Sequence, residues 1–371
     1  MSLAEKLRYA RERTGLTGSQ VRERTGIGES SLSEFENEKR EPSLSQLQKL
    51  AEVYRRSLSF FLSDEPIPEE TAVMWREEPD NAGEIEARFL QFCERYHNLE
   101  VWTAEKAPLQ LPEVTSDAGA FGYREASDLA MNVWRQLALG ERPGGSLLTV
   151  LEEVCGVKVL HDTFEPTGNA ACARSDTFGG AILLNTGSAR WRRNHDLAHE
   201  LFHLITWNRF HGSSASGILR PTADEEKLAT SFTANLLMPA EPFRSAIERR
   251  AEDGKITYAG LYDVAREFDV SIESVMWRIH YVYGRGPSRS DETKAQIDAV
   301  KEYWHLYEER TEDTSPAKFP DRYRALAVKA LRNGDISVGR LAEYLEISRQ
   351  QAMKYLRREE AGIEEISFAT S

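Results

Sequence analysis

The chain has 371 residues, of which 40% are hydrophobic, and a formal net charge of −13 at pH 7. This length predicts two or three domains, and the acidic balance argues against a protein that binds nucleic acid over its whole surface. The first residues are charged, no run approaches about 18 apolar residues, and the three cysteines are widely spaced without a CxxC pair, which predicts a cytoplasmic protein with no membrane contact and no disulfide framework.

The charge is unevenly distributed along the chain. Residues 1–62 hold 11 Lys and Arg against 9 Asp and Glu, whereas the remaining residues hold 36 against 51. A charge shift of this kind indicates regions with different tasks. Together with the patterns below, it predicts four segments, at residues 1–63 (the head), 64–125 (the connector), 126–284 and 285–371.

The head has the pattern of five short helices. Thr17 is suited to cap the second helix, Gly26-Ile27-Gly28 forms a turn, and Glu29–Asn37 forms the third helix. Helix, glycine-containing turn and helix is the helix-turn-helix arrangement. The block from Ile27 to Ser43 resembles the Cro and phage-repressor family, whose members bind DNA.

That resemblance implies a DNA interface in two parts. Residues expected at base edges in the major groove are Glu29, Ser30, Ser31 and Ser33, and residues expected near phosphates are Ser19, Gln20, Asn37, Lys39 and Arg40. A single module of this kind binds weakly, so a homodimer on an operator is expected. The alternative is a bundle that docks only onto another repressor-like protein, because four glutamates near the recognition helix repel phosphate.

The connector begins with an acidic, proline-interrupted stretch at residues 64–70, which favours an extended linker. Glu84–Leu99 then reads as an amphipathic helix. Two interpretations of its apolar face remain open. It packs against the following segment, or it pairs with a second copy of the chain.

The segment from Ala126 mixes helices with short strands. Helices are predicted at Asp128–Leu139 and Leu147–Cys155, and strands at Val157–Leu160, Ala170–Arg174 and Ala181–Leu184. The whole chain is therefore predicted to be mostly α with a small antiparallel sheet, an α+β fold. A peptide substrate would add to such a sheet as an extra strand, and the strand that ends at Asn185 is the candidate edge.

The sequence His199-Glu200-Leu201-Phe202-His203 follows that strand. On a helix, His199 and His203 lie one turn apart on one face, so their imidazoles can hold one metal ion. Glu200 projects beside them, where it can take a proton from a metal-bound water. A later helix, Glu226–Pro239, carries a carboxylate on an otherwise small face, which can approach closely and supply a third ligand.

These blocks, with Glu226-x-x-Ala229-x-x-Phe232 and Leu236–Pro239, resemble the ImmA/IrrE metallopeptidases over roughly Ala126–Gly284. The resemblance implies Zn²⁺ held by His199, His203 and Glu226, with Glu226 preferred over Glu225, and Glu200 as the catalytic base. Three protein ligands and one water make an open site of the catalytic kind. It also implies a repressor-type regulator as substrate. The chain departs from the family at Phe202, which is expected to narrow the site, and at His195.

Three further side chains could bind metal or act in the site, and they are His195, His211 and Cys172. His195 lies one turn before His199, and it either stabilises a developing oxyanion or lines the cleft without a chemical role. His211 falls beyond the expected helix end and is not expected to be a ligand. Cys172 is expected to be a small buried residue and not a ligand. Thr206 and Arg209 occupy positions where a metzincin has Gly and His, which excludes that class.

The last segments are helical in pattern. A helix pair at Leu261–Phe268 and Val270–Ile279 closes the metallopeptidase-like segment, a linker follows at Arg285–Arg289, and a charged helix is expected at Gln296–Glu309. Residues 325–358 then show helix-turn-helix spacing, and residues 316–360 hold 10 Lys and Arg against 6 Asp and Glu. DNA contact and a solvated helix of a small regulatory or dimer domain are equally open here. Residues 361–371 are expected to be disordered.

The sequence thus predicts a DNA-binding regulatory protein with a zinc-dependent endopeptidase, which cuts a repressor-type regulator to switch on a stress, mobile-element or phage-defence response. Two other hypotheses stand beside it. The peptidase-like segment senses a ligand without cutting, although an intact Glu200 argues against this, or the chain cuts its own linker at residues 63–83 and releases the head.

Overall fold

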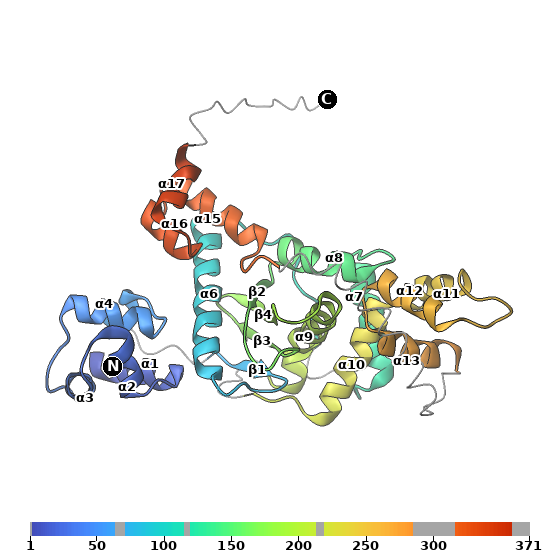
Figure 1. The fold of residues 1–371 in the computed structure, drawn as a ribbon, viewed down its shortest axis with the longest axis horizontal. Coiled ribbons are helices and arrows are strands. Elements are labelled where there is room, and N and C mark those ends of the chain that lie inside the picture. Colours follow the sequence, from blue (N-terminus) through green and yellow to red (C-terminus); the bar gives the residue numbers. More distant parts are fainter. Residues whose placement is uncertain (1, 64–70, 115–118, 213–218, 285–315, 358–371) are drawn as a thin grey trace.

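The computed structural model describes residues 2–63, 71–114, 119–212, 219–284 and 316–357. Figure 1 shows a body built around a small sheet, with the head on one side and a C-terminal helical unit above it. The α+β class predicted from the sequence is confirmed. The predictions for Arg285–Arg289, Gln296–Glu309 and residues 361–371 lie outside the described residues.

All five helices expected in the head are present. They are α1 (Leu3–Thr14), α2 (Gly18–Thr25), α3 (Glu29–Glu36), α4 (Leu44–Val53) and α5 (Leu58–Leu62). Thr17 caps α2 as expected, because its side chain accepts a hydrogen bond from the backbone N–H of Gln20, whose own side chain returns to Thr17. Gly26 ends α2 with φ of 74°, a left-handed conformation that glycine adopts at little cost.

The sheet has four strands, β1 (Val73–Trp75), β2 (Lys158–Asp162), β3 (Ala170–Ser175) and β4 (Gly179–Asn185), in the order β1-β3-β4-β2. The prediction of a purely antiparallel sheet is wrong in one pairing, because β2 and β4 run parallel. The physical reason is that the chain crosses from β2 to β3 before it turns back into β4. β3 runs opposite to both β2 and β4, so β2 and β4 point the same way.

The predicted edge strand is also wrong. β4 is paired on both sides, with β3 antiparallel and with β2 parallel, so its backbone groups are already used by the ladder. The outer strands are β1 and β2. Both are partly covered, since Met74 of β1 bridges to Leu219 and the backbone N–H of His161 in β2 donates to the carbonyl of Lys318. Strand pairing between distant segments decided this, and a local pattern does not report it.

Each face of the sheet supports its own core. Side chains of β4 alternate, so that Ile182 and Leu184 face one core while Ala181 and Leu183 face the other. The helices of the first core are α7 (Tyr123–Gln136), α8 (Pro143–Thr149) with a π-helical turn at Val150–Val154, α9 (Arg190–Phe210), α10 (Ala223–Leu237), α11 (Ala240–Glu248), α12 (Tyr258–Phe268) and α13 (Ile272–Tyr283). The second core holds α6 (Ala82–Trp102), α15 (Asp321–Asn333), α16 (Val338–Tyr344) and α17 (Arg349–Arg357).

The connector is part of the body. It supplies β1 to the sheet, and its helix α6 buries Phe89 and Tyr96 against the second core. Packing within the chain therefore accounts for the apolar face of α6, for which the sequence allowed two interpretations. Within the parts of the chain that the structure describes, no helix is long and apolar enough to cross a bilayer.

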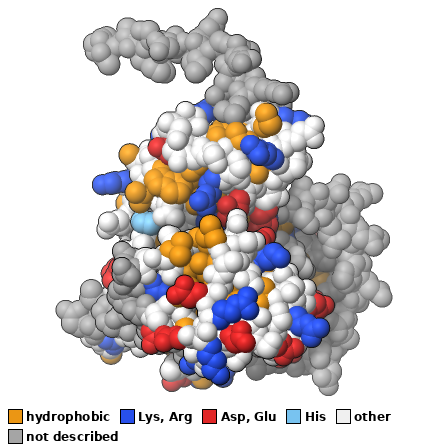
Figure 2. Space-filling model, turned by 90° about the vertical axis from the view of Figure 1, so that its left-hand side faces the viewer, with side chains coloured by type: hydrophobic (Ala, Val, Ile, Leu, Met, Phe, Trp, Pro, Cys, Tyr) orange, Lys and Arg blue, Asp and Glu red, His pale blue; other side chains and the backbone are white. Residues whose placement is uncertain are grey.

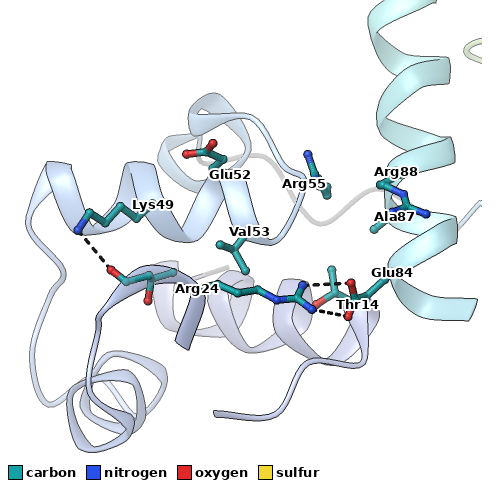
Figure 3. Close-up of a pocket in the computed structure, with 10 residues that line it drawn as sticks. Thr14, Arg24, Lys49, Glu52, Val53, Arg55, Glu84, Ala87 and Arg88 are labelled. Carbon is teal, nitrogen blue, oxygen red and sulfur yellow. Dashed lines mark hydrogen bonds and ion pairs between the residues drawn. The ribbon is translucent and has the colours of Figure 1, made fainter. Parts of the chain in front are cut away.

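The head docks on the first half of α6. Arg24 pairs with Glu84 at 2.8 Å, Arg13 with Glu86 at 3.0 Å, and the backbone of α1 lies so close to Gly83 that an added Cβ would be 2.9 Å from a carbonyl oxygen. Beside this contact is a cavity of about 410 Å³. Figure 3 shows its charged side chains, which reach into it from the head and from α6.

Candidate metal centre

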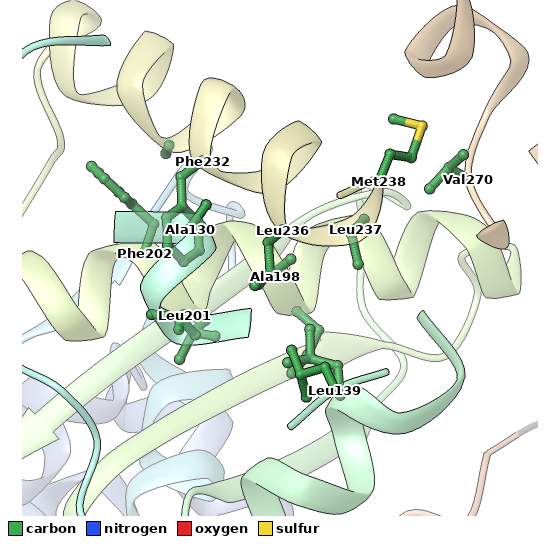
Figure 4. Packing of buried hydrophobic residues seen from close by; sticks show 14 of the residues in the cluster. Ala130, Leu139, Ala198, Leu201, Phe202, Phe232, Leu236, Leu237, Met238 and Val270 are labelled. Atoms are coloured by element: carbon green, nitrogen blue, oxygen red, sulfur yellow. The ribbon is translucent and has the colours of Figure 1, made fainter. Parts of the chain in front are cut away.

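Helix α9 carries the His-Glu-x-x-His sequence across the sheet. All residues from Asp196 to Trp207 are buried, because one side of α9 packs on β3 and β4 and the other side meets α10. Figure 4 shows this second contact, where Phe202 and Ala198 of α9 face Phe232 and Leu236 of α10. Two helices held this closely bring side chains from both into one place.

The structure brings the three predicted ligands together. The Nε2 atoms of His199 and His203 lie 3.2 Å apart, and the Glu226 carboxylate lies 3.3 Å from the first and 3.4 Å from the second. The three ligand atoms all lie within 4.8 Å of one another. Glu226 reaches this point from the first turn of α10, which approaches α9 closely where Ala229 is buried without exposed surface.

The residues present fit a divalent cation. Glu226 Oε1 is buried without a hydrogen-bond partner among the described residues, although two imidazole nitrogens and its own second oxygen stand beside it. A buried carboxylate oxygen without a hydrogen-bond partner is unfavourable, and a bound cation would compensate its charge. Two imidazoles and one carboxylate are the donor set of open zinc sites in hydrolases.

A second carboxylate orients one of the two histidines. Glu225 Oε1 lies 2.9 Å from His203 Nδ1 and 3.1 Å from His211 Nε2. A neutral His203 that donates its Nδ1–H to Glu225 presents the Nε2 lone pair to the cluster. Glu225 is thus placed as a support for His203 and Glu226 as the group facing the cluster, while His211 stays outside it.

The histidines have different proton affinities. Burial lowers the pKa of His199 to about 4. Burial alone would also lower the pKa of His203, but its hydrogen bond with Glu225 and its contact with the Glu226 carboxylate outweigh burial and raise the pKa to about 9. Burial would raise the pKa of the Glu225 and Glu226 carboxyl groups, but their contacts with the histidines outweigh burial and hold both pKa values well below the usual range. A cation that binds here therefore displaces a proton from His203.

Glu200 lies on the side of α9 that faces β3. It is 2% exposed, and burial raises its pKa to about 7. Its partner is Cys172 of β3, whose thiol donates a hydrogen bond to the carboxylate. Cys172 is fully buried and stays outside the ligand cluster, in line with the expectation of a small core residue.

The two residues that depart from the family occupy different environments. His195 stands one turn before His199, with ring centroids 6.0 Å apart, and is partly exposed. Phe202 lies beside one of the ligands, with its ring centroid 5.6 Å from that of His203, and the expectation that it narrows the site stays a prediction. The ring of Phe202 is fully buried, 5.5 Å from Phe232, because the helix places it on the face that meets α10.

Sequence reasoning missed one residue beside the cluster. Arg76, directly after β1, places its guanidinium 3.6 Å from Glu226 Oε2. It comes from the connector, more than a hundred residues away along the chain, and no local signal marks it. It becomes visible only once the pairing of β1 with β3 is known.

The arrangement around Glu225 gives a first prediction. Glu225→Gln is expected to weaken zinc binding by about 10–100-fold, because an amide supports the Nδ1–H of His203 less well than a carboxylate does. Competition against a coloured chelator measures this affinity. Asp224→Asn, an exposed neighbour on the same helix, is the matched control and should bind as the unaltered chain does. Unchanged affinity in Glu225→Gln would mean that packing alone orients His203.

The predicted DNA-contacting residues lie on the surface of the head. Glu29, Ser30 and Ser33 on α3 are exposed, as are Gln20, Lys39 and Arg40, while Ser31 is half-buried. One of the glutamates that counted against DNA binding faces away, since Glu36 is buried and its carboxylate pairs with Arg11 at 2.7 Å. In the lower half of Figure 2, where the head faces the viewer, acidic and basic side chains alternate.

Comparison with known proteins finds two family models, one within the head and one within the body. The helix-turn-helix family model matches residues 7–61, and the model for the IrrE N-terminal-like domain, of the peptidase M78 family, matches residues 152–280. The HTH-type transcriptional regulator ImmR of Bacillus subtilis (strain 168) is 33% identical over 67 residues, which are 18% of this chain and 53% of that protein. The chain therefore spans about half the length of this relative. No solved structure matches the chain.

The matched ranges contain the features derived above. The first range holds α2, the Gly26 turn and α3, and the second holds the sheet strands β2 to β4 together with α9 and α10. Residues 7–61 thus form a helix-turn-helix domain of the DNA-binding type, and residues 152–280 form an IrrE N-terminal-like domain of the peptidase M78 family.

Proposed function

We propose that this chain is a cytoplasmic, zinc-dependent endopeptidase that is tethered to DNA by its head and cuts a repressor-type regulator. One observation carries the proposal, namely the convergence of His199, His203 and Glu226 with Glu200 buried beside them. Structural ion pairs rarely place two imidazoles and a carboxylate around one point with a further carboxylate next to it. The peptidase M78 family match supports the same chemistry.

The residues divide the work of peptide hydrolysis. Bound zinc would supply Lewis-acid polarisation of the scissile carbonyl and a water of lowered pKa. Glu200 accepts the proton of the attacking water and passes it to the leaving amine. Its pKa of about 7, raised by burial, suits a group that must both take and give a proton near neutrality.

The proposed substrate class rests on which proteins the metal centre would meet on DNA. A peptidase held at an operator by its own head meets other proteins that bind the same DNA. The curated relative is an HTH-type transcriptional regulator, which is the class of protein that such a site would encounter. Cutting a repressor of this kind would switch on the genes that it silences.

The test is a cleavage assay with purified full-length chain and a repressor-type protein encoded beside it. Cleavage should give two fragments whose masses define one peptide bond, and a zinc chelator should stop it. Incubation of the chain alone tests self-cleavage within residues 63–83. Arg76 belongs to this stretch and lies beside Glu226, so the hypothesis needs this test. An intact repressor and an intact chain, with zinc bound, would contradict proteolysis and favour a sensor.

The head is proposed to bind a palindromic operator as a homodimer. Changing Ser30 and Ser31 to Ala is expected to relax sequence preference, because the resemblance to the Cro and phage-repressor family implies that these residues face bases. Changing Lys39 and Arg40 to Ala should weaken binding to all duplexes alike and reduce the salt dependence by about one power of salt concentration per lost phosphate contact. Fluorescence anisotropy over a salt series measures both effects.

Lys227→Ala is the control for this experiment. Lys227 is exposed on α10, in the body and not in the head, so its loss should leave both preference and salt dependence unchanged. No binding at low salt by a correctly folded chain, even on its own promoter, would leave the head as a protein-docking module.

A further inference from the structure

The C-terminal unit repeats the helix-turn-helix of the head. Adding 320 to a residue number in the head gives its counterpart in α16 and α17. The matched positions have the same structural role in the two units. Thr17 and Ser337 are the N-caps of the first helix, and Gly26 and Glu346 are left-handed residues in the turn that follows it. The other matched pairs are buried, before the first helix, within it and in the second helix: Leu16/Ile336, Val21/Leu341 and Leu32/Ala352.

The turn is the most specific part of this match. Gly26 has φ of 74° and Glu346 has φ of 52°, and in each unit the next helix begins three residues later, at Glu29 and at Arg349. A non-glycine residue seldom adopts this backbone conformation unless the surrounding fold requires it. The repeated geometry indicates that α17 stands to α16 as α3 stands to α2.

Charge distinguishes the two second helices. Helix α3 contains three glutamates and no Lys or Arg, whereas α17 contains two arginines, one lysine and no acidic residue. The difference falls on matching positions, because Arg349 replaces Glu29 and Lys354 replaces Glu34. The unit that carries α17 is thus the better suited of the two to approach phosphates.

Helix α17 is also available. Among residues 349–355, Ala352 alone is buried, and the others are exposed. Neither Arg349 nor Lys354 has an ion-pair partner in the part of the chain that the structure describes. Gln350 stands at the position that Ser30 holds in the head, and its amide is suited to read adenine in a major groove.

The unit is held firmly on the second half of α6. Arg322 of α15 pairs with Glu100 at 2.5 Å and Arg95 of α6 pairs with Glu343 at 2.7 Å. Aromatic rings fill the space between, with Tyr96 and Tyr323 5.2 Å apart. Figure 1 shows the head and this unit at different levels of the same helix, so α6 carries both modules.

From the repeated turn, the exposed face and the reversed charge, we propose that α15–α17 is a second duplex-DNA-binding module. Helix α17 enters the major groove, with Gln350 at base edges and Lys354 at a phosphate. The side chain of Arg349 is longer than that of Glu29 at the matching position of α3, and it reaches out to a second phosphate. The chain then grips DNA at two points, one through α3 and one through α17. This goes beyond the operator contact of the head, and it stands even if the head only docks proteins.

The test uses the full chain in a Lys39→Ala/Arg40→Ala background, so that the head contributes little, and a mixed-sequence duplex of a few helical turns as probe. Arg349→Glu/Lys354→Glu is expected to reduce affinity at least about tenfold at low salt. It should also lower the slope of log affinity against log salt by about two, close to one per lost phosphate contact. Gln350→Ala should shift the sequences recovered from a random pool without changing the slope.

Arg124→Glu/Lys227→Glu is the matched control. It changes the net charge equally at two exposed positions on α7 and α10. Circular dichroism and thermal melting show whether each variant is folded, and the neutral pair Arg349→Gln/Lys354→Gln repeats the experiment without added negative charge. Equal affinity and equal slope for the α17 variants and the matched control would overturn the proposal.

Discussion

A Glu200→Gln chain is expected to keep its fold and its zinc but to cut the repressor at least about 10²–10⁴-fold more slowly, because an amide cannot accept the proton of the attacking water. The side chain keeps its size and its place against Cys172, so the ligand cluster is not disturbed. Fragment formation over time, followed by intact mass, measures the rate. Zinc content is measured on the same sample.

Stability provides an independent readout of the same substitution. The folded-state pKa of Glu200 is raised to about 7 from an ordinary value of 4.5, so deprotonation is disfavoured in the folded chain. The resulting penalty is absent below pH 4.5, grows between pH 4.5 and 7, and is complete above that range. The metal-free Glu200→Gln chain should therefore melt no lower than the unaltered metal-free chain at pH 8.

Glu241→Gln, an exposed carboxylate on α11, is the control, and it should cut at the original rate. If Glu200→Gln cuts normally, Glu200 is not the base. If cells that carry this variant still derepress their target genes, proteolysis is not the output and the domain acts as a sensor.

The second large effect is on metal content. Purified chain should hold about one Zn²⁺, and His199→Ala should hold none after dialysis, because two remaining ligands from different helices bind far more weakly than three. Burial keeps the pKa of His199 near 4, so the imidazole is already neutral at pH 7 and binds without losing a proton. Elemental analysis of the dialysed protein decides the question.

His195→Ala is the matched control, since it removes an imidazole from the same helix one turn earlier, outside the ligand cluster. That variant should retain its zinc. A His199→Ala chain that keeps stoichiometric zinc would show that the cluster is not the metal site. Circular dichroism separates loss of metal from loss of fold.

Features with a local period were predictable from the sequence. His199 and His203 recur at the spacing of one helical turn, and the leucines of α9 fall on the faces that the structure buries. The head was predictable for the same reason, because N-caps and a glycine turn mark its helices. In each case the signal and the structure lie within a few residues of each other.

Features that depend on distant partners were not predictable. β4 looked like an edge because nothing in its own residues reports that β2 and β3 occupy both sides. Glu225 and Glu226 are neighbours on one helix, and the resemblance favoured the second as ligand. The role of the first depends on His203 and on His211, which lies beyond the end of α9.

The position of β1 has a consequence for how such a chain is assembled during evolution. Gene fusion can exchange the head at residues 64–70 and leave the sheet whole, because β1 begins after them at Val73. A junction at residue 125 would discard β1 and α6 together, and with them the buried Phe89 and Tyr96 of the second core. Heads of different DNA specificity are therefore interchangeable at the first junction alone, provided that each keeps basic residues for Glu84 and Glu86 and leaves room at Gly83.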